Sequence, residues 1–187
     1  GFAILLWFGS VLLGILAGTL MGFFGGRWDL FGQRGAEALE SLPFFLTLLA
    51  VVSFLEAEFW VVFSFFLVFG WTTTAAHVRA QILKLRRQEF VMALHAQGAG
   101  PVRIIGKHIL PLSMMPVLTL APFAITSALY SLAALNFLGL GWGSSTPSWG
   151  ELLRQANQHF MTAWWLAVFP CGALCLIFLL LQGLSDS

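Results

Sequence analysis

The longest stretches without a charged side chain place the strongest limit on how this sequence can fold. No Asp, Glu, Lys or Arg occurs in five runs of 26, 15, 20, 42 and 31 residues. A helix needs about 20 apolar residues to cross the hydrocarbon core of a bilayer, and four of these runs are long enough alone. The 15-residue run becomes long enough if its helix begins near Ala36. We therefore predict five membrane-spanning helices, at about 2–25, 37–55, 58–78, 112–137 and 162–184.

The composition supports a membrane protein and excludes several other classes. Hydrophobic residues make up 59% of the chain and charged residues only 9%, whereas a soluble domain carries about a quarter charged residues. Disorder requires high charge, and nucleic-acid binding requires a basic surface that a net charge of +1 does not provide. The apolar runs at 63–69 and 175–181 lack the alternation of a transmembrane β-strand. The prediction is an all-α transmembrane fold, a polytopic helical bundle that forms one domain over 1–187.

The distribution of Lys and Arg predicts the orientation, because these residues accumulate in cytoplasmic loops. If the first helix runs from outside to inside, eight of the nine basic residues are cytoplasmic and only Arg154 lies outside. This arrangement places the segment 79–111 in the cytoplasm and the loop 138–161 outside. Since Gly1 opens directly into an apolar helix that enters from outside, we expect an earlier span upstream and a chain that continues beyond Ser187.

Small and reactive residues inside the predicted spans have structural interpretations. Gly14, Gly18 and Gly22 recur at every fourth residue, which lines one helix face with small residues and predicts close approach of another helix. Cys171 and Cys175 lie about one helical turn apart in the last span. Two thiolates in hydrocarbon would need a metal and further ligands, and we interpret them as ordinary buried thiols.

Phosphate and metal chemistry find little support in the sequence. The glycine-rich run GLGWG at 139–143 is not framed by a strand and a helix, and no GxxxxGK[ST] sequence occurs, so we expect no ATP site in this chain. The four histidines lack any ligand spacing. We therefore expect no metal site and no cofactor bound by this chain.

The segment between the third and fourth predicted spans holds six of the nine basic residues and indicates a helix, a break and a second helix. Phe90, Ala93, Leu94 and Gln97 fall on one face of the first helix, at 86–97. The sequence GAGP at 98–101 breaks it, and the second helix, at 102–110, ends at a proline. Such a segment suits either a soluble partner that pushes on it or anionic lipid headgroups, and these physical arguments leave both open.

The residues of this segment resemble the EAA loop of permease subunits of binding-protein-dependent ABC importers. The match consists of EFVMALHAQG at 89–98 and IIGKHILP at 104–111, beside the pattern E-Y-V-x-A-A-x-x-x-G and I-I-x-R-H-I-L-P-N of the dipeptide/oligopeptide branch. GTLMGFFGGRWD at 18–29, SLP at 41–43, LNFLGLG at 135–141 and TPSWG at 146–150 are also similar to that branch. Met92, Leu94 and Leu112 depart from its pattern. Within this resemblance, the sequence LNFLG at 135–139 favours the peptide permeases that also transport microcin-C-like peptide conjugates.

The resemblance implies a six-span bacterial inner-membrane permease, non-catalytic itself, that forms half of a translocation pathway for peptides or peptide-like solutes. It also implies the partners: a second permease, two ATP-binding subunits that carry ATP and Mg, and an extracytoplasmic solute-binding protein. The helix at 88–97 would seat in a cleft of an ATPase subunit. The implied coupling residues are Phe90, Ala93, Leu94, Gln97, Gly98 and Pro111.

Substrate handling can be predicted only in outline. No carboxylate or basic residue lies deep in a predicted span, which argues against an ion-coupled relay. Polar groups that could line a weakly binding path are Thr126, Ser127, Ser131 and Asn136. A secondary carrier or channel that works without an ATPase is the alternative function, and it predicts internal repeats and broken helices with midplane charges. An intramembrane enzyme would need a paired nucleophile and base.

Overall fold

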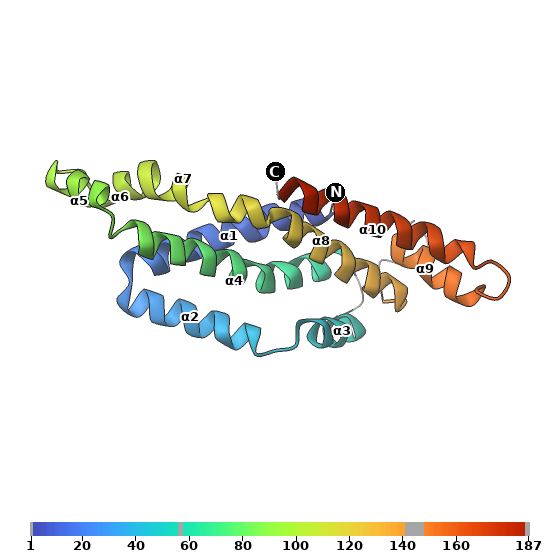
Figure 1. The fold of residues 1–187 in the computed structure, drawn as a ribbon. Helices are drawn as coiled ribbons and strands as arrows, with labels where there is room; N and C mark the ends of the chain where they lie inside the picture. Colours follow the sequence, from blue (N-terminus) through green and yellow to red (C-terminus); the bar gives the residue numbers. More distant parts are fainter. Residues whose placement is uncertain (1, 56–57, 141–147, 186–187) are drawn as a thin grey trace. The chain divides into compact units, whose positions relative to one another are not determined.

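The computed structural model describes residues 2–55, 58–140 and 148–185, and every element in these ranges is helical (Figure 1). Residues 1–6, 43–66 and 121–187 cluster into one compact unit, and residues 7–42 and 67–120 into a second. A π-helical turn at Ile105–Ile109 lies between α6 and α7. The α-helices are α1 (Phe2–Phe24), α2 (Gly26–Glu40), α3 (Phe44–Leu55), α4 (Phe59–Leu85), α5 (Glu89–Ala96), α6 (Pro101–Ile104), α7 (Leu110–Ser113), α8 (Met115–Phe137), α9 (Trp149–Gln158) and α10 (Trp165–Ser185).

Four of the predicted spans are present as long apolar helices. Within the described residues, α1, α4, α8 and α10 are each long and apolar enough to cross a membrane. Their ends lie close to the predicted ones, except that α4 continues past Val78 and ends at Leu85. The predicted all-α polytopic fold is confirmed.

The predicted continuous span at 37–55 is wrong. The chain forms two helices there, α2 and α3, separated by residues 41–43. Leu42 precedes Pro43, and a residue before proline is disfavoured in the helical conformation, while the proline lacks the N–H that would continue the helix. The pair meets the length and hydropathy required of a span only as an interrupted helix. Glu37 and Glu40 therefore belong to a separate charged helix, α2, rather than to the start of a span.

The predicted glycine face of α1 is confirmed. A Cβ atom added to Gly14 would lie 2.5 Å from the Cβ atom of Thr74, and one added to Gly22 would lie 2.9 Å from the Cβ atom of Ile82. At Gly18 the added Cβ atom would lie 2.6 Å from a backbone oxygen of α4. Such distances leave no room for a side chain, so the three glycines let the backbones of α1 and α4 approach closely.

The second unit has a continuous apolar core, which we call the junction cluster. Its centre is fully or almost fully buried and joins α4 and α5 to the helical segment 104–117. Residues of α1 pack against its edge. The buried members are Val78, Ile82, Val91, Ile104, Ile109 and Val117, and the partly buried ones are Val11, Ile15, Phe23, Leu85, Leu94, Ala99 and Met114.

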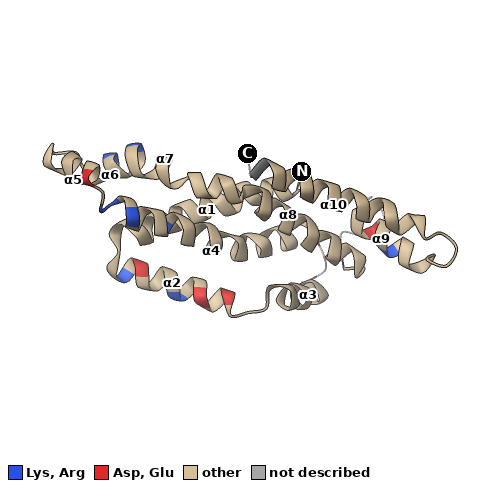
Figure 2. Cartoon of the chain, in the orientation of Figure 1, with Lys and Arg blue, Asp and Glu red and all other residues tan. Residues whose placement is uncertain are grey.

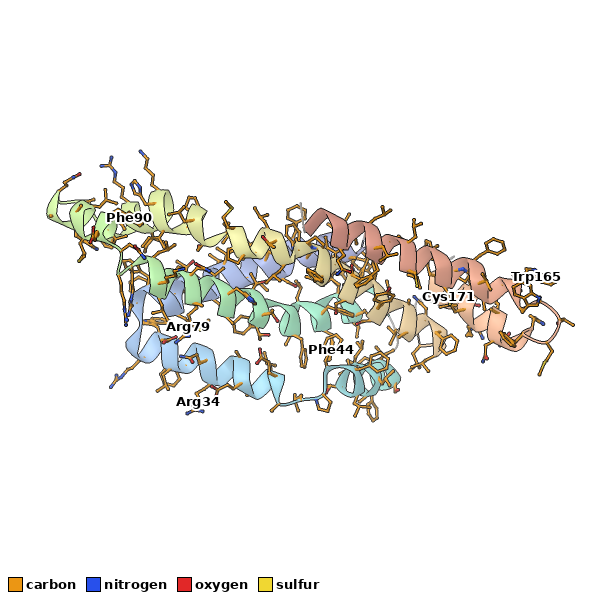
Figure 3. The ribbon with its side chains drawn as sticks, in the orientation of Figure 1. Arg34, Phe44, Arg79, Phe90, Trp165 and Cys171 are labelled. Atoms are coloured by element: carbon orange, nitrogen blue, oxygen red, sulfur yellow. The ribbon has the colours of Figure 1, made fainter. Side chains whose placement is uncertain are left out.

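The two cysteines are not buried by the chain itself. Cys171 and Cys175 are free and exposed on α10 (Figure 3). They share one face of the helix because four residues make about one turn. They are free thiols, as interpreted, but the chain itself does not bury them, and this face of α10 is left uncovered by the described residues.

Candidate coupling site

Helix α5 packs on the body of its unit through one narrow side. Val91 is 2% exposed and belongs to the junction cluster, and Leu94, one turn further on, packs against the same cluster. Phe90 is 39% exposed and Met92 57% exposed, and Ala93 and Gln97 are exposed as well. The helix thus has an anchored side and an open side.

The anchored and open sides of α5 divide the four residues that were expected to share one face. Phe90, Ala93 and Gln97 lie on the open side of the α5 segment, as their spacing predicts. Leu94 turns toward the chain's own core instead, because the i, i+3 pair that it forms with Val91 fills the junction cluster. A partner protein would therefore find the first three side chains and little of Leu94.

Gly98 ends α5 with a left-handed turn. Its φ is 79°. The N–H of Gly98 donates to the carbonyl of His95 and the N–H of Ala99 donates to the carbonyl of Leu94, both at 3.0 Å. This pair of bonds is the Schellman motif, in which glycine avoids the steric cost of a positive φ. A Cβ atom at Gly98 would meet nothing within 4 Å, so the positive φ, and not a lack of space, favours glycine at this position.

The second half of the segment begins as predicted and ends differently. Pro101 occupies the first turn of α6, where its missing N–H is not needed. Pro111 was predicted to end the helix, and this is wrong because it lies within α7, which leads through Met114 into α8. The π-helical turn directly before α7 interrupts the regular hydrogen-bond ladder at the point where a proline clashes with the carbonyl four residues earlier.

Charged residues cluster where α1, α2 and α4 meet (Figure 2). Arg79 of α4 binds both carboxylate oxygens of Asp29 in α2, and the bond from its Nη2 to Oδ2 measures 2.8 Å. Arg86 donates from Nη1 to the carbonyl oxygen of Gly22 in the last turn of α1, at 3.1 Å. Sequence reasoning missed both contacts. Asp29 stands in one of the motifs that carry the resemblance, but its partner lies 50 residues away and no periodicity indicates it.

The predicted pathway residues differ in their surroundings. Thr126 is 5% exposed and donates to the carbonyl of Pro122 at 2.8 Å, and Asn136 is 7% exposed and donates to the carbonyl of Leu132 at 3.0 Å. Ser127 is exposed and Ser131 is partly buried. The two buried polar groups are satisfied by their own helix, as polar side chains in spans commonly are.

Helix α9 contains several polar contacts between its own residues. The Ser148 hydroxyl accepts from the N–H of Glu151 at 3.1 Å and caps the helix. Arg154 donates from Nε and Nη2 to the two carboxylate oxygens of Glu151, and Gln155 donates to the same carboxylate. Hydrogen bonds from Arg154 and Gln155 lower the pKa of Glu151 from 4.5 to about 2. The motif residues 141–147 lie outside the described residues.

Metal-ligating side chains are scattered in the described part of the chain. Among these residues, no group of three or more His, Cys, Asp or Glu side chains could hold a metal ion. His77 bonds within its own helix, where its Nδ1 donates to the carbonyl oxygen of Thr73 at 2.7 Å.

Comparison with known proteins places these features in context. The family described as "Binding-protein-dependent transport system inner membrane component" matches residues 11–187. The chain is 35% identical over 163 residues to the inner membrane ABC transporter permease protein YejE of Escherichia coli, an alignment that covers 87% of this chain and 48% of the relative. It is 36% identical over 163 residues to the peptidoglycan transport system permease protein YejE of Agrobacterium fabrum, covering 87% and 43% of the two chains.

A third relative has a different transport name. The oligopeptide transport system permease protein OppC of Bacillus subtilis is 31% identical over 167 residues, which cover 89% of this chain and 55% of the relative. The chain thus spans about half the length of the curated relatives that it matches.

Proposed function

Because the chain belongs to the family of binding-protein-dependent transport system inner membrane components, we propose that it forms half of the translocation pathway of an ATP-driven importer. Its cargo is a peptide or a peptide-like solute. Helix α5 is the site at which the ATP-binding subunits act on it. The observation that carries this proposal is the two-sided construction of α5, anchored through Val91 and open at Phe90 and Ala93.

The open side of α5 suits a protein partner better than a lipid surface. An amphipathic helix that lies on anionic lipid carries Lys or Arg along its polar face, and α5 (EFVMALHA) contains neither. Its exposed side chains combine the aromatic ring of Phe90, the thioether of Met92 and small alanines. Aromatic residues and methionine are enriched at protein interfaces.

The junction cluster beneath α5 could transmit a movement of this helix to the candidate spans. The junction cluster connects α5 with α4, with α1 and with the start of α8, all of which are long apolar helices except α5 itself. A displacement of α5 would therefore reach three candidate spans through packed side chains, and packed interiors transmit such displacements because they are hard to compress.

Relatives with named cargo support the substrate class. Their names refer to oligopeptide, dipeptide and peptidoglycan transport, and peptide bonds are common to all three cargos. The partners that follow are a second permease, two ATP-binding subunits and an extracytoplasmic solute-binding protein. In the orientation that the distribution of Lys and Arg predicts, the segment 79–111 is cytoplasmic and the loop 138–161 is extracytoplasmic.

Reconstitution tests the proposal directly. The complete permease is incorporated into liposomes with its partner permease, ATP-binding subunits and binding protein, and uptake of a labelled peptide mixture is followed. We expect uptake that requires ATP, and no uptake or ATP hydrolysis by the permease alone.

The alternative is an ATP-independent carrier or channel. Uptake driven by a proton or sodium gradient through the permease alone would contradict the proposal and support that alternative. A variant with Ala93→Asp on the open side of α5 serves as the matched control. A charge placed in the contact with the ATP-binding subunit should abolish ATP-driven uptake, while uptake through an independent carrier should stay unchanged.

A further inference from the structure

Two arginines tie the end of α4 to the turn between α1 and α2. Arg79 and Asp29 form a bidentate ion pair whose side chains are 25% and 19% exposed. The pair Arg34–Glu37 on the same helix α2 is a useful contrast, since its side chains are 72% and 58% exposed and only three residues separate them. Bidentate arginine–carboxylate pairs fix orientation as well as distance. The pair Arg79–Asp29 therefore holds α2 to α4, whereas the pair Arg34–Glu37 joins only residues within α2.

The second arginine holds α1. The Gly22 carbonyl belongs to the last turn of α1, where carbonyl groups lack partners within the helix, and Arg86 donates to it at 3.1 Å. Gly25 and Gly26, with φ of 63° and 55°, then reverse the chain into α2. Arg86 is also the residue directly after α4, three positions before α5 begins at Glu89.

We propose that Asp29, Arg79 and Arg86 form a polar joint that makes the α1–α2 turn move together with α5 when the coupling helix is displaced. This inference rests on the proposed function of α5. The residues act as positioning residues, since none of them belongs to α5. Figure 3 shows Arg79 directed toward α2, whereas Phe90 lies on α5.

The junction cluster and the polar joint contribute differently to the link between α5 and the end of α1. The junction cluster joins α5 to α1 and α4, but apolar contacts are not directional. The joint adds directional bonds at the end of α4, on the segment that leads into α5. Because Arg86 lies three residues before α5, a displacement of α5 that moves Arg86 also moves the end of α1 to which Arg86 is bonded.

The test compares uptake with ATP consumption in the reconstituted importer. Asp29→Asn keeps the shape of the side chain and removes its charge, and we expect the amount of peptide imported per ATP hydrolysed to fall about fivefold or more. Glu37→Gln on the same helix is the matched control and should leave this ratio unchanged. The exchange Asp29→Arg with Arg79→Asp should restore most of it, which a general loss of folding would not allow.

A second measurement does not depend on transport. Spin labels at Phe24 and Met92, in a full-length permease with Cys171 and Cys175 replaced by serine, report the distance between the end of α1 and α5. We expect one narrow distance distribution in the wild-type background and a broad one in Asp29→Asn. A distribution equally narrow in both, or unchanged uptake per ATP in Asp29→Asn, would overturn the joint. Absence of ATP-driven uptake by the wild-type complex would instead contradict the proposed function and leave the distance measurement to decide on the joint.

Discussion

Helices α5 and α9 are both short, lie outside the long apolar helices and are held in different ways. Helix α5 buries apolar side chains, Val91 and Leu94, and its one acidic residue, Glu89, is exposed. Helix α9 also buries a small face, at Gly150 and Ala156, but its acidic residue is not free: the Glu151 side chain is 11% exposed and accepts hydrogen bonds from Arg154 and Gln155 of the same helix. Helix α5 therefore keeps an exposed side available to a partner, whereas the strongest polar groups of α9 are paired within the helix itself.

The largest expected difference between the two helices is their side of the membrane. We expect a cysteine at Gln88, next to α5, to be protected from an impermeant thiol reagent in sealed cells, because the basic residues around it belong in the cytoplasm. A cysteine at Gln158, at the end of α9, should react fully. Both positions are exposed, and labelling is measured by mass shift in a background without Cys171 and Cys175. Reaction at Gln88 would invert the orientation.

A smaller effect is expected from crowding α9. A Cβ atom at Gly150 would lie 2.1 Å from the carbonyl oxygen of Ala133 in α8. Since this neighbour is backbone, Gly150→Ala forces the helices apart, and overpacking of this kind costs about 1–3 kcal/mol. We expect a lower thermal unfolding midpoint in detergent. Gly172→Ala is the control because a Cβ atom there meets nothing within 4 Å, and equal midpoints for the two variants would contradict the close approach.

The turn after α5 should be sensitive to conformation rather than to space. Gly98→Val places a β-branched residue at a φ of 79°, which costs about 1 kcal/mol or more. We expect reduced ATP-driven uptake with unchanged insertion in the membrane. Gly98→Asn tolerates the left-handed conformation and should retain most of the activity. Wild-type uptake by the valine variant would show that the left-handed turn does not position α5.

Some of these features follow from the sequence, and others do not. The spacing of Gly14, Gly18 and Gly22 predicts close packing because a helix repeats every 3.6 residues, and the run GAGP predicts the turn at Gly98 for local steric reasons. The ion pair between Asp29 and Arg79 depends on how α2 folds back, which local patterns do not encode. The length of the apolar run at 41–55 does not reveal the break before Pro43, whereas the proline itself does, because it disfavours helix at the preceding residue.

The smallest expected effect is the pH dependence of the stability of α9. Hydrogen bonds lower the pKa of Glu151 from 4.5 to about 2, so its pairing with Arg154 stabilises the folded state above about pH 4.5 and is lost as the pH falls toward 2. We expect hydrogen exchange of the α9 amides to stay constant between pH 8 and 5, after correction for intrinsic rates. The amides of α9 in Glu151→Gln should exchange faster at every pH in this range. A protection that changes around pH 6 would contradict this assignment.

Cross-linking from α5 tests the central claim most directly. A photo-reactive residue at Ala93, on the open side of α5, and a matched one at Leu152, which is 47% exposed on α9, are introduced into the full-length permease in its native membrane. We predict that Ala93 captures the ATP-binding subunit in high yield and that Leu152 captures none of it. Capture of the ATP-binding subunit from Leu152, or its absence from Ala93 in an intact complex, would contradict the assignment of α5 as the coupling helix.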